Sequence, residues 1–196
     1  MRGYTPRMTS LRDFESTGAL LSGHFRLSSG RHSDRYLQCA RLLQWPERAE
    51  AAGRELAAKL EEFSPDVVVS PAMGGILIGH EVARALKRPF LFVERQEGAF
   101  ALRRGFAIDP GAAVVIVEDV FTTGKSTREV ISTLEPLGAR VVAVGSIVNR
   151  GLPQDAFSVP SRSLLSLDVP SWPEAECPLC ARGTAIDTPG SRHAKK

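Results

Sequence analysis

The sequence is poor in the features that mark nucleic-acid-binding and membrane proteins. Aromatic residues make up 7% of the 196 residues, too few to predict a stacking platform for single-stranded nucleic acid. The 25 basic and 22 acidic side chains leave a net charge of +3, which argues against electrostatic binding of DNA. No apolar run approaches the roughly 18 residues of a membrane span. We therefore expect neither a nucleic-acid nor a membrane partner.

Cysteine is equally scarce. The three residues Cys39, Cys177 and Cys180 make no even set for a disulfide framework. The opening residues 1–21 lack the apolar segment of a secretory signal. Both observations predict a protein of the reducing cytoplasm.

Cys177 and Cys180 nevertheless form a CxxC pair. A structural zinc needs four ligands, and this pair supplies two. His193 is a candidate third ligand, and the tails of two chains could complete a site together. Because nothing in the sequence demands either arrangement, we expect plain structural thiols and no metal ligands among the side chains.

What is present is the composition of a globular protein, with 43% hydrophobic and 24% charged residues. Residues 1–65 are mixed and helical in character. Within residues 47–63, apolar side chains recur every three or four positions, which predicts an amphipathic helix between Pro46 and Pro65.

Residues 66–148 alternate between short apolar runs and helical patterns. Apolar runs without polar alternation predict strands that are buried on both faces, and helices between them predict parallel pairing. We therefore expect a doubly wound, mostly parallel α/β sheet flanked by helices. The expected strands are residues 66–70, 90–94, 112–119 and 141–148, and the expected helices are residues 76–86 and 126–137.

Two segments do not fit this alternation. Residues 95–111 form a long connection with several arginines and glycines, and connections of this length are usually functional or mobile. Residues 153–196 are rich in proline, which predicts an irregular extension. We expect a domain over residues 1–152, including small N-terminal elements, with the extension 153–196 packed on it.

The most informative segment is VVIVEDVFTTGKST at residues 114–127. An apolar strand ends in Glu118 and Asp119, and a turn of small residues then leads into a helix. Ligands of parallel sheets bind at the carboxyl ends of strands, and amides at a helix N-terminus bind phosphate. Carboxylates can accept hydrogen bonds from sugar hydroxyls and favour positive charge at the anomeric carbon. The candidate phosphate-binding residues are Thr122, Thr123, Gly124, Lys125, Ser126 and Thr127.

Two other interpretations of this segment stay open. Gly124-Lys125-Ser126 resembles the end of a P-loop, but that motif requires glycine at the position of Asp119. The acidic pair could also merely end a strand, with the following residues capping a helix.

The segment resembles the phosphoribosyl-diphosphate motif of the type I phosphoribosyltransferases. PAMGG at residues 71–75 occupies the place of that family's pyrophosphate loop, where Gly74 and Gly75 suit close approach of the backbone to a diphosphate. The segments at residues 25–39, 94–106 and 146–151 narrow the resemblance to the orotate phosphoribosyltransferases. It covers about residues 20–152, and the tail from Cys177 resembles one bacterial branch.

The resemblance implies roles for individual residues. Glu118 and Asp119 would hold the ribose hydroxyls, and residues 122–126 would hold the 5′-phosphate. Arg150 would contact orotate, with Tyr36 near the base. The family's pyrophosphate loop often carries a lysine where this chain has Gly74. The cations of the long connection, Arg95, Arg103 and Arg104, would approach the diphosphate.

The resemblance also implies a reaction and its partners. Orotate would displace diphosphate from 5-phosphoribosyl 1-diphosphate, with Mg²⁺ as cofactor, held mainly by the substrate. A homodimer with shared active sites is implied as well. Two alternatives stay open: a purine-type phosphoribosyltransferase, and a nucleotide-sensing regulator that binds RNA.

Overall fold

The computed structural model describes residues 9–27 and 29–189. These residues divide into two compact units. The first contains residues 9–10 and 43–167, and the second contains residues 11–42 and 168–189. This division differs from the predicted boundary at residue 152, since the end of the chain joins the N-terminal elements.

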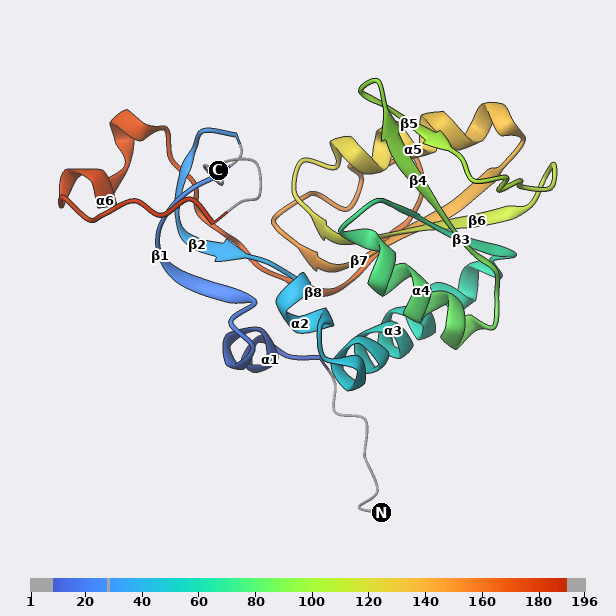
Figure 1. The fold of residues 1–196 in the computed structure, drawn as a ribbon, viewed down its shortest axis with the longest axis horizontal. Coiled ribbons are helices and arrows are strands. Elements are labelled where there is room, and N and C mark those ends of the chain that lie inside the picture. The colour runs from blue at the N-terminus through green and yellow to red at the C-terminus, as the bar shows by residue number, and fades with distance from the viewer. Residues whose placement is uncertain (1–8, 28, 190–196) are drawn as a thin grey trace, which may run out of the picture. The chain divides into compact units, whose positions relative to one another are not determined.

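The first unit is built on one sheet, in which the described residues place six strands in the order β5-β4-β3-β6-β7-β8 (Figure 1). All neighbours are parallel except β4 and β5. The predicted mostly parallel α/β sheet is therefore confirmed. The strands are β3 (Val67–Pro71), β4 (Phe90–Gln96), β5 (Ala99–Leu102), β6 (Ala113–Phe121), β7 (Arg140–Asn149) and β8 (Ser161–Ser166).

Helices cover both faces of this sheet. On one face α4 packs on β3 and β6, and α3 packs beside it on β7 and β8. On the other face α5 covers a core of valine, isoleucine, leucine and phenylalanine side chains. The predicted helices are confirmed within a few residues. Their bounds are α3 (Pro46–Leu60) followed by η1 (Glu61–Phe63), α4 (Gly75–Leu86), and α5 (Lys125–Leu134) followed by η2 (Glu135–Leu137).

The long connection after the second predicted strand is partly a hairpin. β4 continues to Gln96 and pairs with the antiparallel β5, so that Gln96 lies opposite Ala99. The two loop residues Glu97 and Gly98 both have positive φ, 51° and 90°. Positive φ at both positions is typical of the two-residue turns that match the twist of paired strands. Gly98 was only a weak sequence signal for this turn, because asparagine, aspartate or glycine is the usual residue before glycine there.

Part of the predicted irregular extension, residues 153–196, is a strand instead. Residues 161–166 form β8, which pairs parallel with β7 at the edge of the sheet. Every β8 residue except Ser166 is partly buried, and none is fully buried. A strand on a sheet edge needs less apolar sequence than a central one, which explains why its composition did not reveal it.

The second unit has a two-stranded antiparallel sheet, β1 paired with β2. This hairpin was not predicted for residues 1–65, which were expected to be mixed and helical in character. Residues 168–189 add single bridges to it, Trp172 with His32 and Asp187 with Phe25. The elements are α1 (Leu11–Ser16), β1 (Leu20–Arg26), β2 (His32–Leu37), η3 (Glu174–Glu176) and α6 (Pro178–Ala181), and α2 (Ala40–Leu43) leads into the first unit.

Across the described ranges, we find no helix with the length and apolar character to span a membrane.

Candidate active site

Two adjacent carboxyl groups lie near the carboxyl end of β6. Glu118 is 9% exposed, and Asp119 is partly buried. Burial, together with the negative charge of Asp119, raises the pKa of Glu118 to about 9. Burial also raises the pKa of Asp119. Two buried acids side by side are costly when both are ionised, and hydroxyl donors or a cation would lower that cost.

The loop between β3 and α4 approaches these acids closely. A Cβ atom added at Gly74 would lie 2.9 Å from the carboxyl atoms of Asp119. At Gly75 it would lie 2.8 Å from the backbone oxygen of Val117. Both distances are shorter than a Cβ atom tolerates, so a larger residue at Gly75 would displace the backbone of β6 or this loop, and one at Gly74 would push the carboxyl group of Asp119 aside. The loop includes a cis peptide bond between Ala72 and Met73.

The turn after β6 leads directly into α5. Gly124 is buried, has φ of +70° and occupies the N-cap position of α5. Gly124 has no side chain to cap this helix end, and the hydroxyl of Thr123 accepts from the amide of Lys125 only at a long 3.4 Å. The first-turn amides and the helix dipole therefore favour an anion there. Thr122, Thr123 and Lys125 are exposed around the turn, and Ser126 is partly buried.

Arg128 stabilises the turn before α5 through hydrogen bonds to its backbone, a role that was not predicted from the sequence. Its guanidinium group donates to the backbone oxygen of Thr123 at 2.7 Å and to that of Ala156 at 3.2 Å. The same side chain lies 2.9 Å from the position of a Cβ atom at Gly124. Its spacing four residues into the helix was the one available signal, because a side chain there points back toward the helix start.

Arg150 follows β7, next to the carboxyl end of β6. Its backbone amide donates to the oxygen of Phe121 at 2.9 Å. Its Nε atom is buried and has no hydrogen-bond partner among the described residues. Burial lowers the pKa of Arg150 from its ordinary value. A buried guanidinium nitrogen without a partner is a costly arrangement that an anionic ligand would relieve.

The three arginines of the β4–β5 hairpin and the residues after it have partners within the first unit. Arg95 pairs with Glu129 of α5 at 2.6 Å, and its guanidinium lies over the ring of Phe100. Glu94 pairs with Arg104 at 3.0 Å and more loosely with Arg103 at 3.7 Å. Both of these side chains are more than half exposed. Their predicted contact with a diphosphate stays a prediction.

Tyr36 belongs to the second unit, where it lies on β2. Its ring packs against Phe25 with 5.7 Å between centroids, and it is partly buried. Burial raises the pKa of its hydroxyl. The predicted place of Tyr36 near a base stays a prediction.

The sheet order explains why the first-unit residues converge. β3, β6 and β7 are neighbours and run parallel, so their carboxyl ends meet at one edge of the sheet. That edge carries the glycine loop, the acidic pair, the turn before α5 and Arg150. Acceptors for hydroxyl groups thus lie beside donors for phosphate, as a sugar phosphate requires.

Comparison with known proteins agrees with this geometry. A family model described as "Phosphoribosyl transferase domain" matches residues 38–176. The chain belongs to the orotate phosphoribosyltransferase family. It is 51% identical to the orotate phosphoribosyltransferase of Thermotoga maritima, over 92% of this chain and 97% of that one. It is 52% identical to that of Heliobacterium modesticaldum, over 91% and 95% of the two chains.

A solved structure shares the fold of this phosphoribosyltransferase. The orotate phosphoribosyltransferase of Aeropyrum pernix matches 80% of this chain and 92% of its own, with a TM-score of 0.69 and 27% identity. The resemblance noted in the sequence is therefore confirmed at the level of the family and the fold.

Proposed function

We propose that this phosphoribosyltransferase transfers the 5-phosphoribosyl group of 5-phosphoribosyl 1-diphosphate to N1 of orotate. The products are orotidine 5′-monophosphate and diphosphate. The observation that carries the proposal is that the acidic pair, the glycine loop and the start of α5 meet at the carboxyl ends of neighbouring parallel strands. In a member of this family, those strand ends supply both the sugar and the phosphate contacts.

The acidic pair binds the ribose. Glu118 and Asp119 accept hydrogen bonds from the 2′- and 3′-hydroxyls, which orients the anomeric carbon toward the incoming base. As the C1–O bond to diphosphate breaks and the N1–C1 bond forms, positive charge develops at this carbon, and the proton that orotate N1 loses passes to the departing diphosphate. Hydrogen bonds from the bound ribose hydroxyls lower the cost of ionising Glu118, so two carboxylates fixed beside the sugar can then stabilise that charge without reorganising during the reaction.

The turn before α5 binds the 5′-phosphate. Backbone amides of residues 123–126 donate to its oxygens, and the threonine and serine hydroxyls add further donors. Arg128 holds this turn through the oxygen of Thr123, so the phosphate site is formed before the substrate arrives. Preorganisation of this kind lowers the entropy cost of placing the reacting carbon.

Cations act on the base and on the leaving group. Arg150, whose Nε atom lacks a partner among the described residues, binds the orotate anion. Arg103 or Arg104 leaves Glu94 and neutralises the diphosphate as it departs, and closure of this segment excludes water. In the dimer that we propose, the segment serves the neighbouring subunit's site.

Mg²⁺ fits the residues of this site as a cofactor. Burial raises the pKa of both acids, and the negative charge of Asp119 raises that of Glu118 further, so a cation that arrives with the substrate would be favoured beside them. When bound, it supplies neutralisation of the diphosphate charge.

The direct test is turnover with defined bases. The protein, Mg²⁺ and 5-phosphoribosyl 1-diphosphate should consume orotate, followed as the loss of its ultraviolet absorbance, and release one diphosphate for each orotate. Adenine, guanine, hypoxanthine and xanthine should give no diphosphate. Reaction with a purine and not with orotate would contradict the substrate, and tight RNA binding without turnover would contradict the enzymatic function.

A further inference from the structure

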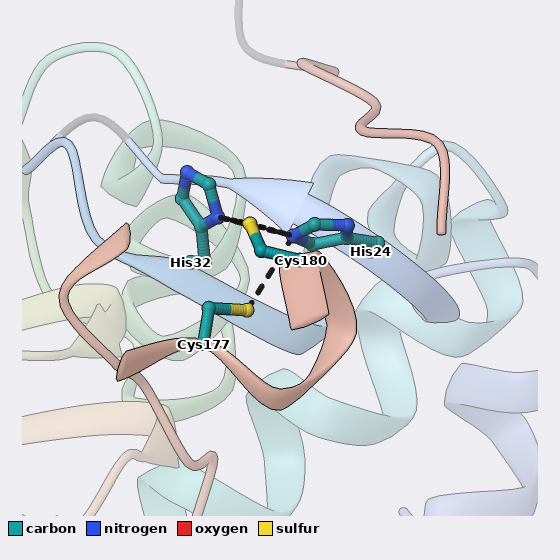
Figure 2. Close-up of side chains that lie close together, drawn as sticks. All are labelled: His24, His32, Cys177 and Cys180. Atoms are coloured by element: carbon teal, nitrogen blue, oxygen red, sulfur yellow. Dashed lines mark hydrogen bonds between the residues drawn. The ribbon is translucent and has the colours of Figure 1, made fainter. Parts of the chain in front are cut away.

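Four side chains outside the candidate active site converge in the second unit (Figure 2). They are His24 on β1, His32 on β2, and the CxxC pair Cys177 and Cys180. One ligand atom from each lies within 4.8 Å of all the others. His24, His32 and Cys177 are about 2% exposed or less, and Cys180 is partly buried. The sequence did not connect these residues, because about 145 positions separate the second histidine from the first cysteine.

The distances fit a tetrahedral metal centre. Zn–N bonds of about 2.0–2.1 Å and Zn–S bonds of about 2.3 Å place two nitrogens about 3.4 Å apart and a nitrogen and a sulfur about 3.6 Å apart. The two imidazole nitrogens, His24 Nε2 and His32 Nδ1, are 3.0 Å apart. The sulfur of Cys180 lies 3.7 Å and 3.2 Å from these nitrogens. The sulfur of Cys177 lies 3.5 Å from His24 Nε2.

The hydrogen bonding of His24 decides which of its ring nitrogens can bind a metal. Its Nδ1 atom lies 2.8 Å from the backbone oxygen of Thr184. A carbonyl oxygen only accepts, so Nδ1 carries the proton and Nε2 of the neutral ring presents a lone pair. A backbone carbonyl that fixes the tautomer in this way is the usual outer partner of a metal-binding histidine.

Hydrogen bonds alone account poorly for this cluster. Three groups, His32 Nδ1 and the two thiols, approach the single lone pair of His24 Nε2 at 3.0–3.7 Å. One lone pair cannot accept from all three at full strength. A central cation, in contrast, receives one lone pair from each of the four groups. Two thiolates and a divalent metal also sum to zero charge, which suits a buried site.

Backbone hydrogen bonds attach the chain to the β1–β2 hairpin both before and after the CxxC pair. His32 and Trp172 exchange two backbone hydrogen bonds of 2.8 Å. The amide of Asp187 donates to the oxygen of His24 at 2.8 Å. The CxxC pair lies between these two attachments, so the hairpin and the extension both position ligands.

Residues 168–189 bury very little besides this cluster. Within residues 168–189, Cys177 is the one fully buried residue. A segment that buries so little apolar surface usually needs a disulfide or a metal to hold its fold. The structure records both thiols as free.

We propose that His24, His32, Cys177 and Cys180 bind one structural Zn²⁺ ion per chain. Four nitrogen and sulfur ligands in a closed, largely buried tetrahedron are typical of structural zinc, because no position is left for a substrate or water. The ion fastens residues 168–189 to the β1–β2 hairpin.

The metal content of the full-length protein tests this proposal. Protein purified in reducing buffer from zinc-supplemented cells should contain one zinc per chain by elemental mass spectrometry. The double variant Cys177→Ser with Cys180→Ser should lose it. Cys39→Ala and His80→Ala, which change a thiol and an imidazole outside the cluster, should keep it. Zinc that is absent from the wild-type protein, or retained by the double variant, would overturn the proposal.

Cobalt substitution of the wild-type protein provides a readout that needs no variant. Co²⁺ added to metal-free wild-type protein should give tetrahedral d–d bands and thiolate-to-cobalt absorption. Cys180→His keeps four ligands, so it should bind one Co²⁺ with about half of that absorption. Removal of zinc with a chelator should speed amide exchange in residues 168–189 by at least tenfold. Octahedral cobalt bands, or a Cys177–Cys180 disulfide in the freshly purified protein, would contradict a zinc site.

Discussion

Replacing Glu118 with glutamine should change how the stability of the protein depends on pH. Burial and the adjacent Asp119 raise the pKa of Glu118 from 4.5 to about 9. Between these values the folded state keeps a proton that the unfolded state has released, so the free energy of unfolding falls as pH rises. Glutamine does not titrate and removes this fall.

The magnitude follows from the pKa shift. One pH unit within this window corresponds to about 1.4 kcal/mol, so the two units from about pH 5.5 to about pH 7.5 give roughly 3 kcal/mol as an upper limit. Because Asp119 shares the titration, we expect the Glu118→Gln variant to gain about 1–3 kcal/mol over the wild type across this range.

Urea denaturation at a series of pH values measures this difference. Glu61→Gln, which removes an exposed carboxylate from η1, is the matched control and should follow the wild-type curve closely. Parallel curves for Glu118→Gln and the wild type would refute the reasoning, because Glu118 would then be ionised in the folded protein at neutral pH.

Three further variants test the site itself. Asp119→Asn should lower kcat/KM by about 10²–10³-fold in a protein that still folds, since it weakens an acceptor fixed beside the developing charge; near-normal turnover would remove its role on the ribose. Arg128→Ala should raise the KM for 5-phosphoribosyl 1-diphosphate about tenfold, because the turn loses the charged donor to Thr123; an unchanged KM would mean that the turn holds its shape unaided. Arg103→Ala combined with Arg104→Ala should lower kcat more than it weakens orotate binding in an equilibrium titration, and an unchanged kcat would place neutralisation of the diphosphate elsewhere.

The central part of the fold could be predicted because its signals are local. The apolar run that becomes β6, the two acids after it and the small-residue turn before α5 are contiguous. Parallel pairing then brings the ends of β3, β6 and β7 to one edge, so the convergence of Glu118, Gly74 and Arg150 follows from strand order. The support that Arg128 gives to the turn depends on the direction of its side chain, and its place four residues into the helix was a weak signal for that role.

Features that depend on distant pairing could not be predicted. β8 was missed because a strand on a sheet edge needs little apolar sequence, and β5 because a two-residue turn was hidden in a long connection. The cluster of His24, His32 and the CxxC pair depends on backbone bonds between β1–β2 and the end of the chain. Spacing along the sequence carries no record of such bonds. His193, considered as a ligand from the sequence, lies outside the described residues.

The central claim is that the loops at the carboxyl ends of β3, β6 and β7 bind the activated sugar. A crystal structure with 5-phosphoribosyl 1-diphosphate and Mg²⁺ tests it most directly. The account predicts the 5′-phosphate on the amides of residues 123–126 and the ribose hydroxyls on Glu118 and Asp119. Density for the sugar at any other place on the protein would contradict it.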